Sequence, residues 1–332
     1  VVNGLILAEF GKKMIKRLKN YPELTDILDK YGADALRYYL MSSQAVRAED
    51  LAFSEKGLDE VVKKIINRLE NVISFYELYT NNESRGHSVS TKHILDRWID
   101  TRFNELTKEV TDGLDKYELD RASRPIADFV DDLSTWYLRR SRNRPEALPK
   151  LREILLDLSK LLAPFMPFLA EDIYRRLDGE KESVHLEEWP KGQTLSIDSQ
   201  GLALMSETRR IVSLALELRQ KANIKVRQPL AELKIKNKDL ADEYLEIIKD
   251  ELNVKKISVD ASLSEEVWLD TNITPELEEE GRVRDAIRSV QEWRKEKNLK
   301  PGEKANYEVR DAEKDLFSKH AEEIKRATNI EF

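Results

Sequence analysis

The sequence contains no cysteine, which excludes disulfide bonds, thiolate zinc sites and cysteine nucleophiles. Only four histidines occur, and none is spaced from another as metal ligands on a helix are. Glycine-rich phosphate loops and the HExxH metalloprotease motif are also absent. The sequence therefore predicts no metal site and no complete catalytic site of these classes.

The chain also lacks an apolar run of about 18 residues and a signal-peptide pattern, so we expect a cytoplasmic protein with no membrane span. It opens with Val1 and not with Met, which favours an internal fragment or a processed chain. The formal net charge of −7 argues against indiscriminate binding of nucleic acid, although local basic patches can still bind it. We expect a monomer.

Helical periodicity dominates the first 180 residues. Apolar positions recur at steps of three and four in four long segments, which start near Val62, Leu95, Ala122 and Leu151. Pro164 and Pro167 predict a kink or a break in the last segment. Long amphipathic helices with short connections favour an antiparallel bundle.

The pattern changes after a polar stretch at 191–200, which suits a linker. A helix is expected over 204–222 and another over 240–252, and short strands near Leu233, Val254–Val259 and Val267–Leu269. Thr274 and Pro275 are typical of a helix start, and Tyr307 with Val309 predicts a last strand. The second part is thus expected to be a small α+β domain, and the fold class as a whole is mainly α.

Several motifs in collinear order carry a family resemblance. The chain reads KMIKR at 13–17, YGADALR at 31–37, LLAPFMPFLAEDIY at 161–174, IKVRQPL at 224–230 and TPELEEEG at 274–281. Together they resemble the isoleucyl-tRNA synthetases of class I, from the KMSKS loop to the C-terminal region. The resemblance implies a remnant of the loop and junction over 1–30, a helical anticodon-binding bundle over 31–190, and a C-terminal module over 200–332.

The chain departs from the family pattern at two positions, one in the KMSKS loop and one just before it. Ile15 stands where the KMSKS loop has serine, and Phe10 stands where the residue before Gly11 is usually aspartate. The HIGH signature is missing as well. Lys13, Met14 and Lys16 correspond to the ATP loop of the family, where the second lysine stabilises phosphate charge. With half of that cradle absent, we expect a solvated basic loop, no cofactor in this chain and no activity of the chain alone.

The functional prediction therefore falls on basic clusters further along. Arg139, Arg140, Arg142 and Arg144 lie within six residues that contain no carboxylate, beside Trp136. Arginine binds phosphates bidentately and stacks on bases, so this cluster is a candidate for tRNA contact. On one helix, Arg139 would share a face with Arg142, and Arg140 with Arg144. The alternative is pairing with Asp128, Asp131 or Asp132. Lys225 and Arg227 form a smaller candidate cluster, which could equally be a solvated turn.

The prediction from sequence is thus the anticodon-arm-binding part of an isoleucyl-tRNA synthetase. The resemblance implies a parent enzyme that ligates isoleucine to its tRNA with ATP and magnesium. Two alternatives stay open: a non-catalytic helical scaffold that binds proteins, and the corresponding part of a valyl-tRNA synthetase.

Overall fold

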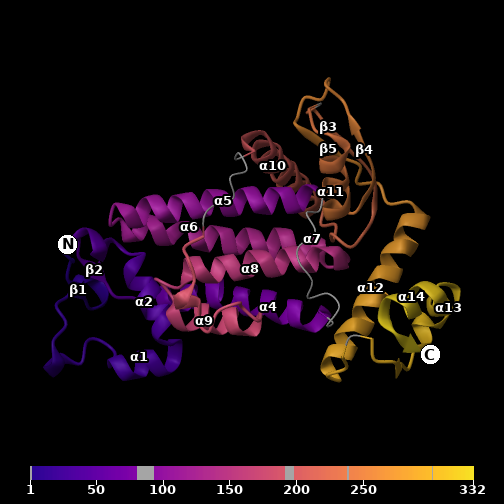
Figure 1. Ribbon diagram of the computed structural model, residues 1–332. Helices are drawn as coiled ribbons and strands as arrows, with labels where there is room; N and C mark the ends of the chain where they lie inside the picture. The colour runs from indigo at the N-terminus through magenta and orange to yellow at the C-terminus, as the bar shows by residue number, and fades with distance from the viewer. Residues whose placement is uncertain (1, 81–92, 191–197, 238, 301) are drawn as a thin grey trace. The chain divides into compact units, whose positions relative to one another are not determined.

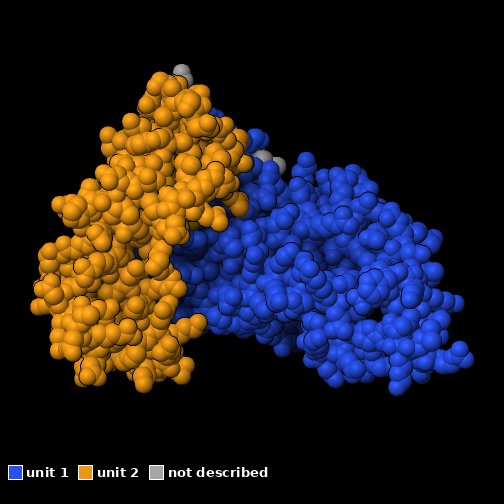
Figure 2. Space-filling model, turned by 180° about the vertical axis from the view of Figure 1, so that it is seen from behind, with its two compact units in different colours: residues 1–202 blue, residues 203–332 orange. Residues whose placement is uncertain are grey.

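The computed structural model describes residues 2–80, 93–190, 198–237, 239–300 and 302–332. They form two compact units, residues 1–202 and 203–332, which are coloured separately in Figure 2. Within the described ranges, no helix is long and apolar enough to cross a membrane. Most of the linker expected at 191–200 falls outside these ranges.

The first unit begins with a small region of short elements. Its strands pair in parallel, with Ile6 opposite Leu51 and Leu7 opposite Ala52. The elements are β1 (Ile6–Leu7), α1 (Leu24–Tyr31), α2 (Ala33–Met41), β2 (Leu51–Ala52) and α3 (Glu55–Val61). Asp34 of α2 ties this region to the bundle, because its carboxylate accepts the backbone N–H of Leu169 at 2.6 Å, in the first turn of α9.

The rest of the first unit is a helical bundle, as the periodicity predicts (Figure 1). Its helices are α4 (Asn67–Tyr79), α5 (Ile94–Asp115), α6 (Leu119–Asp131), α7 (Arg139–Ser141), α8 (Leu148–Leu162) and α9 (Pro167–Arg176). α5 packs along α6, and α8 along α9, α4 and α5. The apolar faces form one core that includes Ile99, Phe129 and Leu158, each fully buried.

The expected break at the two prolines is confirmed. α8 ends at Leu162, and α9 starts at Pro167, where a proline suits the first helical position because its missing N–H needs no partner there. Two stretches of π-helix, Val62–Ile66 before α4 and Asp132–Leu138 between α6 and α7, are absent from the prediction. In a π-helix each N–H bonds to the carbonyl five residues back, which changes the direction of every side chain that follows.

The second unit contains a three-stranded sheet in the order β4-β3-β5. β3 (Leu230–Ile235) is central; it pairs in parallel with β4 (Val254–Val259) and antiparallel with β5 (Val267–Leu269). The expected strand around Leu233 is thus confirmed, with Leu233 and Ile235 fully buried. The helices of this part are α10 (Ser199–Lys221), which belongs to the second unit from Ala203 on, and α11 (Asp242–Leu252).

A second cluster of the same unit is built on α12 (Pro275–Glu296). The expected helix start is confirmed, since Thr274 Oγ1 accepts the N–H of Leu277 at 3.4 Å. The other elements are β6 (Ala305–Asn306), α13 (Lys314–Lys319), α14 (Ala321–Thr328) and β7 (Ile330–Glu331). The strand expected at Tyr307 and Val309 is wrong: β6 ends at Asn306, and both side chains instead pack on a core around Phe317.

The fold class is therefore mainly α, with a helical bundle followed by a small α+β region, as predicted.

Candidate nucleic-acid interface

The loop that carries Lys13, Met14 and Lys16 is held by one side chain. Asn20 donates through Nδ2 to the carbonyl of Lys13 at 2.9 Å and accepts the N–H of Ile15 at 2.9 Å. Met14 lines an apolar cavity of about 250 Å³ together with Tyr21, whereas Lys13 and Lys16 are exposed. Arg17 is exposed as well, so the motif presents three cations to solvent. Within the described ranges, His, Asp and Glu form no group that could hold a metal ion.

Trp136 of the arginine cluster is not an open stacking surface. It lies in the π-helical stretch and is only 7% exposed. The guanidinium carbon of Arg140 lies 3.2 Å from the centre of its ring, and Arg140 Nη1 donates to the Trp136 carbonyl at 3.1 Å. The two side chains therefore contact each other, and a base could stack on this indole only after Arg140 moved.

Arg144 is held in a buried ion pair. Its Nη2 lies 2.8 Å from Asp96 Oδ2, and the hydroxyl of Tyr137 donates to Asp96 Oδ1 at 2.7 Å. The side chains of Arg144 and Asp96 are 13% and 1% exposed. Arg144 thus links the end of the arginine cluster to the start of α5, and its charge is neutralised inside the protein.

The expected sharing of a face by Arg140 and Arg144 is wrong. α7 ends at Ser141, and Arg144 precedes Pro145, which disfavours helical backbone in the residue before it. Of the neighbouring aspartates, Asp131 pairs with Arg68 at 2.5 Å and Asp132 with Arg102 at 2.9 Å.

Arg139 and Arg142 are the exposed members of the cluster. Both follow the buried π-helical stretch Asp132–Leu138. Whether either contacts RNA stays a prediction.

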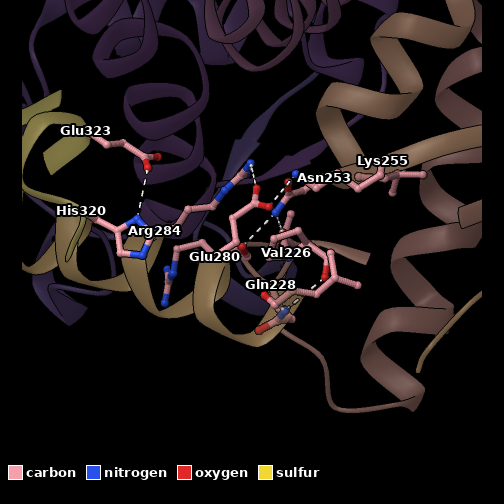
Figure 3. A network of polar contacts seen from close by, with 12 residues as sticks. Val226, Gln228, Asn253, Lys255, Glu280, Arg284, His320 and Glu323 are labelled. Atoms are coloured by element: carbon pink, nitrogen blue, oxygen red, sulfur yellow. Dashed lines mark hydrogen bonds and ion pairs between the residues drawn. The ribbon is translucent and has the colours of Figure 1, made fainter. Parts of the chain in front are cut away.

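The smaller basic cluster lies on a turn of the second unit that three side chains hold in place (Figure 3). Arg219 Nη1 donates to the carbonyls of Lys225 and Gln228, both at 3.0 Å. Asn253 Nδ2 donates to the carbonyl of Arg227 at 2.8 Å, and Gln228 Nε2 to that of Leu277 at 2.7 Å. The turn is therefore fixed to α10, α11 and α12.

The two candidate side chains of this turn differ. Lys225 is exposed, whereas Arg227 Nε lies 2.6 Å from Asp285 Oδ1 of α12. Beside them, Glu280 pairs with Lys255 and Arg284 at 2.5 and 2.8 Å. Burial alone would raise the pKa of Glu280, but these two cations outweigh it and hold the pKa below its usual range. The turn thus presents Lys225 as an exposed cation, whereas Arg227, Lys255 and Arg284 are paired with carboxylates.

Arg219 is the important residue that the sequence interpretation missed. It is 1% exposed, and this burial lowers its pKa to about 10. One signal could have identified it: Arg219 continues the apolar face of α10 that Ile211, Val212 and Ala215 begin. A lone arginine on a buried helix face needs acceptors, and here they are backbone carbonyls.

Comparisons with known proteins agree with this arrangement. Residues 96–236 match the family described as the anticodon-binding domain of tRNA ligase, and residues 1–52 match the class I tRNA synthetases (I, L, M and V). Isoleucine–tRNA ligase of Protochlamydia amoebophila is 41% identical over 278 residues, and that of Chlamydia trachomatis serovar D is 41% identical over 277 residues.

A solved LeuRS–tRNA–LeuAMS ternary complex from Agrobacterium radiobacter K84 is 20% identical to this chain. That match covers 60% of this chain and 24% of the other, with a TM-score of 0.43, which is too low to support an argument.

The alignments to the two isoleucine–tRNA ligases cover 78% and 77% of this chain but 27% of each relative. The chain therefore spans about a quarter of the length of the curated relatives that it matches. The chain belongs to the class I tRNA synthetase family, and it contains the anticodon-binding domain of a tRNA ligase.

Proposed function

We propose that this chain binds the anticodon arm of a tRNA, specifically an isoleucine tRNA. The observation that carries the proposal is the family match over residues 96–236, which includes the whole arginine cluster. Residues 31–190 would be the recognition bundle and residues 200–332 an accessory module, after a junction over 1–30. The chain would act as a monomer in the cytoplasm.

Arg139 and Arg142 are the residues that we propose for phosphate contact, with Lys225 as a further cation. Their guanidinium and ammonium groups are exposed. Arg140 beside Trp136, Arg144 paired with Asp96 and Arg227 paired with Asp285 would position the surface. The parent reaction, ligation of isoleucine to tRNA with ATP and magnesium, is proposed for a longer enzyme and not for this chain alone.

A binding assay with isoleucine and valine tRNA transcripts at two salt concentrations tests the proposal. We expect tighter binding of the isoleucine transcript and a steep loss of affinity as salt rises, because each neutralised phosphate releases counterions. Arg142→Ala should lower the slope of log K against log salt by about 0.9. Arg175→Ala, which removes another exposed arginine of the same unit, should leave the slope unchanged.

Equal, weak and salt-insensitive binding of both transcripts would remove the proposal. It would favour the alternative of a protein-binding scaffold, which one observation supports. The segment before α1 exposes several large apolar side chains, among them Val2 at 72%, Leu5 at 65% and Phe10 at 88%. Exposed apolar side chains that gather in one segment are typical of a surface that contacts protein.

A further inference from the structure

A polar cavity lies at the corner between α5 and α6. No residue of the arginine cluster lines it. The cavity has a volume of about 430 Å³ and belongs entirely to the first unit. It is lined by Val46, Arg47, Tyr117, Glu118, Asp120 and Arg121. Two arginines and a tyrosine thus surround one opening, which is the composition of sites that hold single-stranded nucleic acid.

A buried carboxylate positions two arginines at this corner. Asp120 is fully buried, and its Oδ2 accepts from Arg47 and lies 3.3 Å from Arg124 Nη2. Arg124 Nε also donates to the carbonyl of Ser42 at 2.9 Å. The arginine side chains themselves are 54% and 56% exposed. Each guanidinium has five N–H donors, so donors remain that point to solvent in a fixed orientation.

Arg121 adds a third cation, and its present partner can be replaced. Its Nη1 lies 3.0 Å from Glu118 Oε2, with the two side chains 59% and 46% exposed. An ion pair that is this open to water is weak, so a phosphate can take the place of the carboxylate. Besides Asp120, the carboxylates of Glu49 and Glu118 also act electrostatically on Arg47.

Tyr117 is present where the fold itself would favour a different residue. It follows α5 with a left-handed φ of 58°, and its N–H closes the helix by bonding to the Leu114 carbonyl at 3.0 Å. Glycine or asparagine is the usual residue at such a helix end, because a side chain with a Cβ strains the backbone there. The tyrosine ring is also 76% exposed, so it does not compensate by packing.

We propose that this corner is a second RNA contact, in which Arg47 and Arg121 bind backbone phosphate and Tyr117 stacks on an unpaired base. The inference rests on the proposed function, since it takes RNA as the partner. It adds a site at the start of α6, whereas the arginine cluster follows the π-helical stretch after α6. About 20 helical residues separate Leu119 from Arg139, a length of roughly 30 Å, so one phosphate group cannot serve both sites.

The variant Tyr117→Gly separates RNA binding from stability. Glycine relieves the backbone strain, so we expect an unchanged or higher melting temperature. Loss of the ring should weaken binding of the isoleucine tRNA transcript about tenfold, since stacking is lost, without changing the salt slope. Phe168→Ala is the matched control, because Phe168 is 72% exposed in the same unit and does not line the cavity.

The variant Arg121→Ala tests the phosphate contact. We expect the slope of log K against log salt to fall by about 0.9, whereas Arg175→Ala should not change it. If the wild-type chain binds the transcript and both Tyr117→Gly and Arg121→Ala bind it equally well, the second site is refuted and the proposed function stands. If the wild-type chain binds no tRNA, both proposals fail together.

Discussion

Phe10 is a residue whose side chain and backbone are both in unfavourable surroundings. It is 88% exposed, and its φ of 62° is left-handed. The resemblance implies aspartate at this position, and aspartate and asparagine tolerate left-handed backbone far better than phenylalanine does. The replacement of a polar residue by Phe10 therefore strains the chain and exposes an apolar ring.

We expect Phe10→Asn to stabilise the chain by about 0.5–1.5 kcal/mol, because the left-handed backbone becomes less strained. Urea unfolding of the first unit measures the change. Phe10→Ala is the control, since it removes the ring but keeps a Cβ in left-handed backbone. If both variants change stability equally, the ring and not the backbone is responsible, and the explanation from φ is wrong.

At the same scale, the sequence located the arginine cluster but could not sort its members. Arg144 and Arg142 are two residues apart, yet one is 13% exposed in an ion pair and the other is open to solvent. The difference comes from Asp96, which is 48 residues away along the chain. A pattern of nearby residues cannot predict a partner at that separation, because the fold alone brings the two together.

At the scale of elements, periodicity predicted the long helices well and their irregularities poorly. The break between α8 and α9 follows from Pro164 and Pro167, whose effect on the backbone is local. The π-helical stretch Asp132–Leu138 has no such local cause in its residues. It places Trp136, Tyr137 and Leu138 all in the core.

The contact between α12 and the junction of α13 and α14 should depend on pH. Glu279 of α12 lies 2.5 Å from Lys319 Nζ and 2.9 Å from His320 Nε2. Lys319 first, and then His320, lower the pKa of Glu279 to about 2. Because the folded pKa lies below the unfolded value of about 4.3, the contribution is present above pH 4.5 and is lost as pH falls towards 2.

We therefore expect Glu279→Gln to flatten the dependence of melting temperature on pH between about 4.5 and 2. The wild-type chain should lose a few degrees more than the variant across this window, measured by thermal unfolding at half-unit steps of pH. Glu323→Gln is a suitable control, since Glu323 lies 3.9 Å from His320 Nδ1 and makes the weaker contact. Parallel curves for the wild-type chain and Glu279→Gln would contradict the assignment.

At the scale of the whole molecule, the family motif at Lys13–Arg17 and the bundle differ in the binding sites that they can form. The bundle has its own core, whereas the motif contributes three exposed cations, Lys13, Lys16 and Arg17, to a nucleotide site. The HIGH signature does not occur in the sequence, and the described residues gather no group of His, Asp or Glu that could hold magnesium. We therefore predict that these residues alone do not form a complete site for ATP and its metal.

Three exposed cations do not bind a nucleotide tightly, because each pair of opposite unit charges 4 Å apart in water gains only about 1 kcal/mol. We expect ATP with magnesium to bind this chain with a Kd no tighter than about 1 mM, which corresponds to roughly −4 kcal/mol. Isothermal titration calorimetry measures it directly. Saturable heat in the micromolar range would overturn the expectation, and loss of that heat in Lys13→Ala or Lys16→Ala would place the nucleotide at the loop. Without such loss, the nucleotide would have to bind at another surface of the chain, and the loop that Asn20 holds would not be its site.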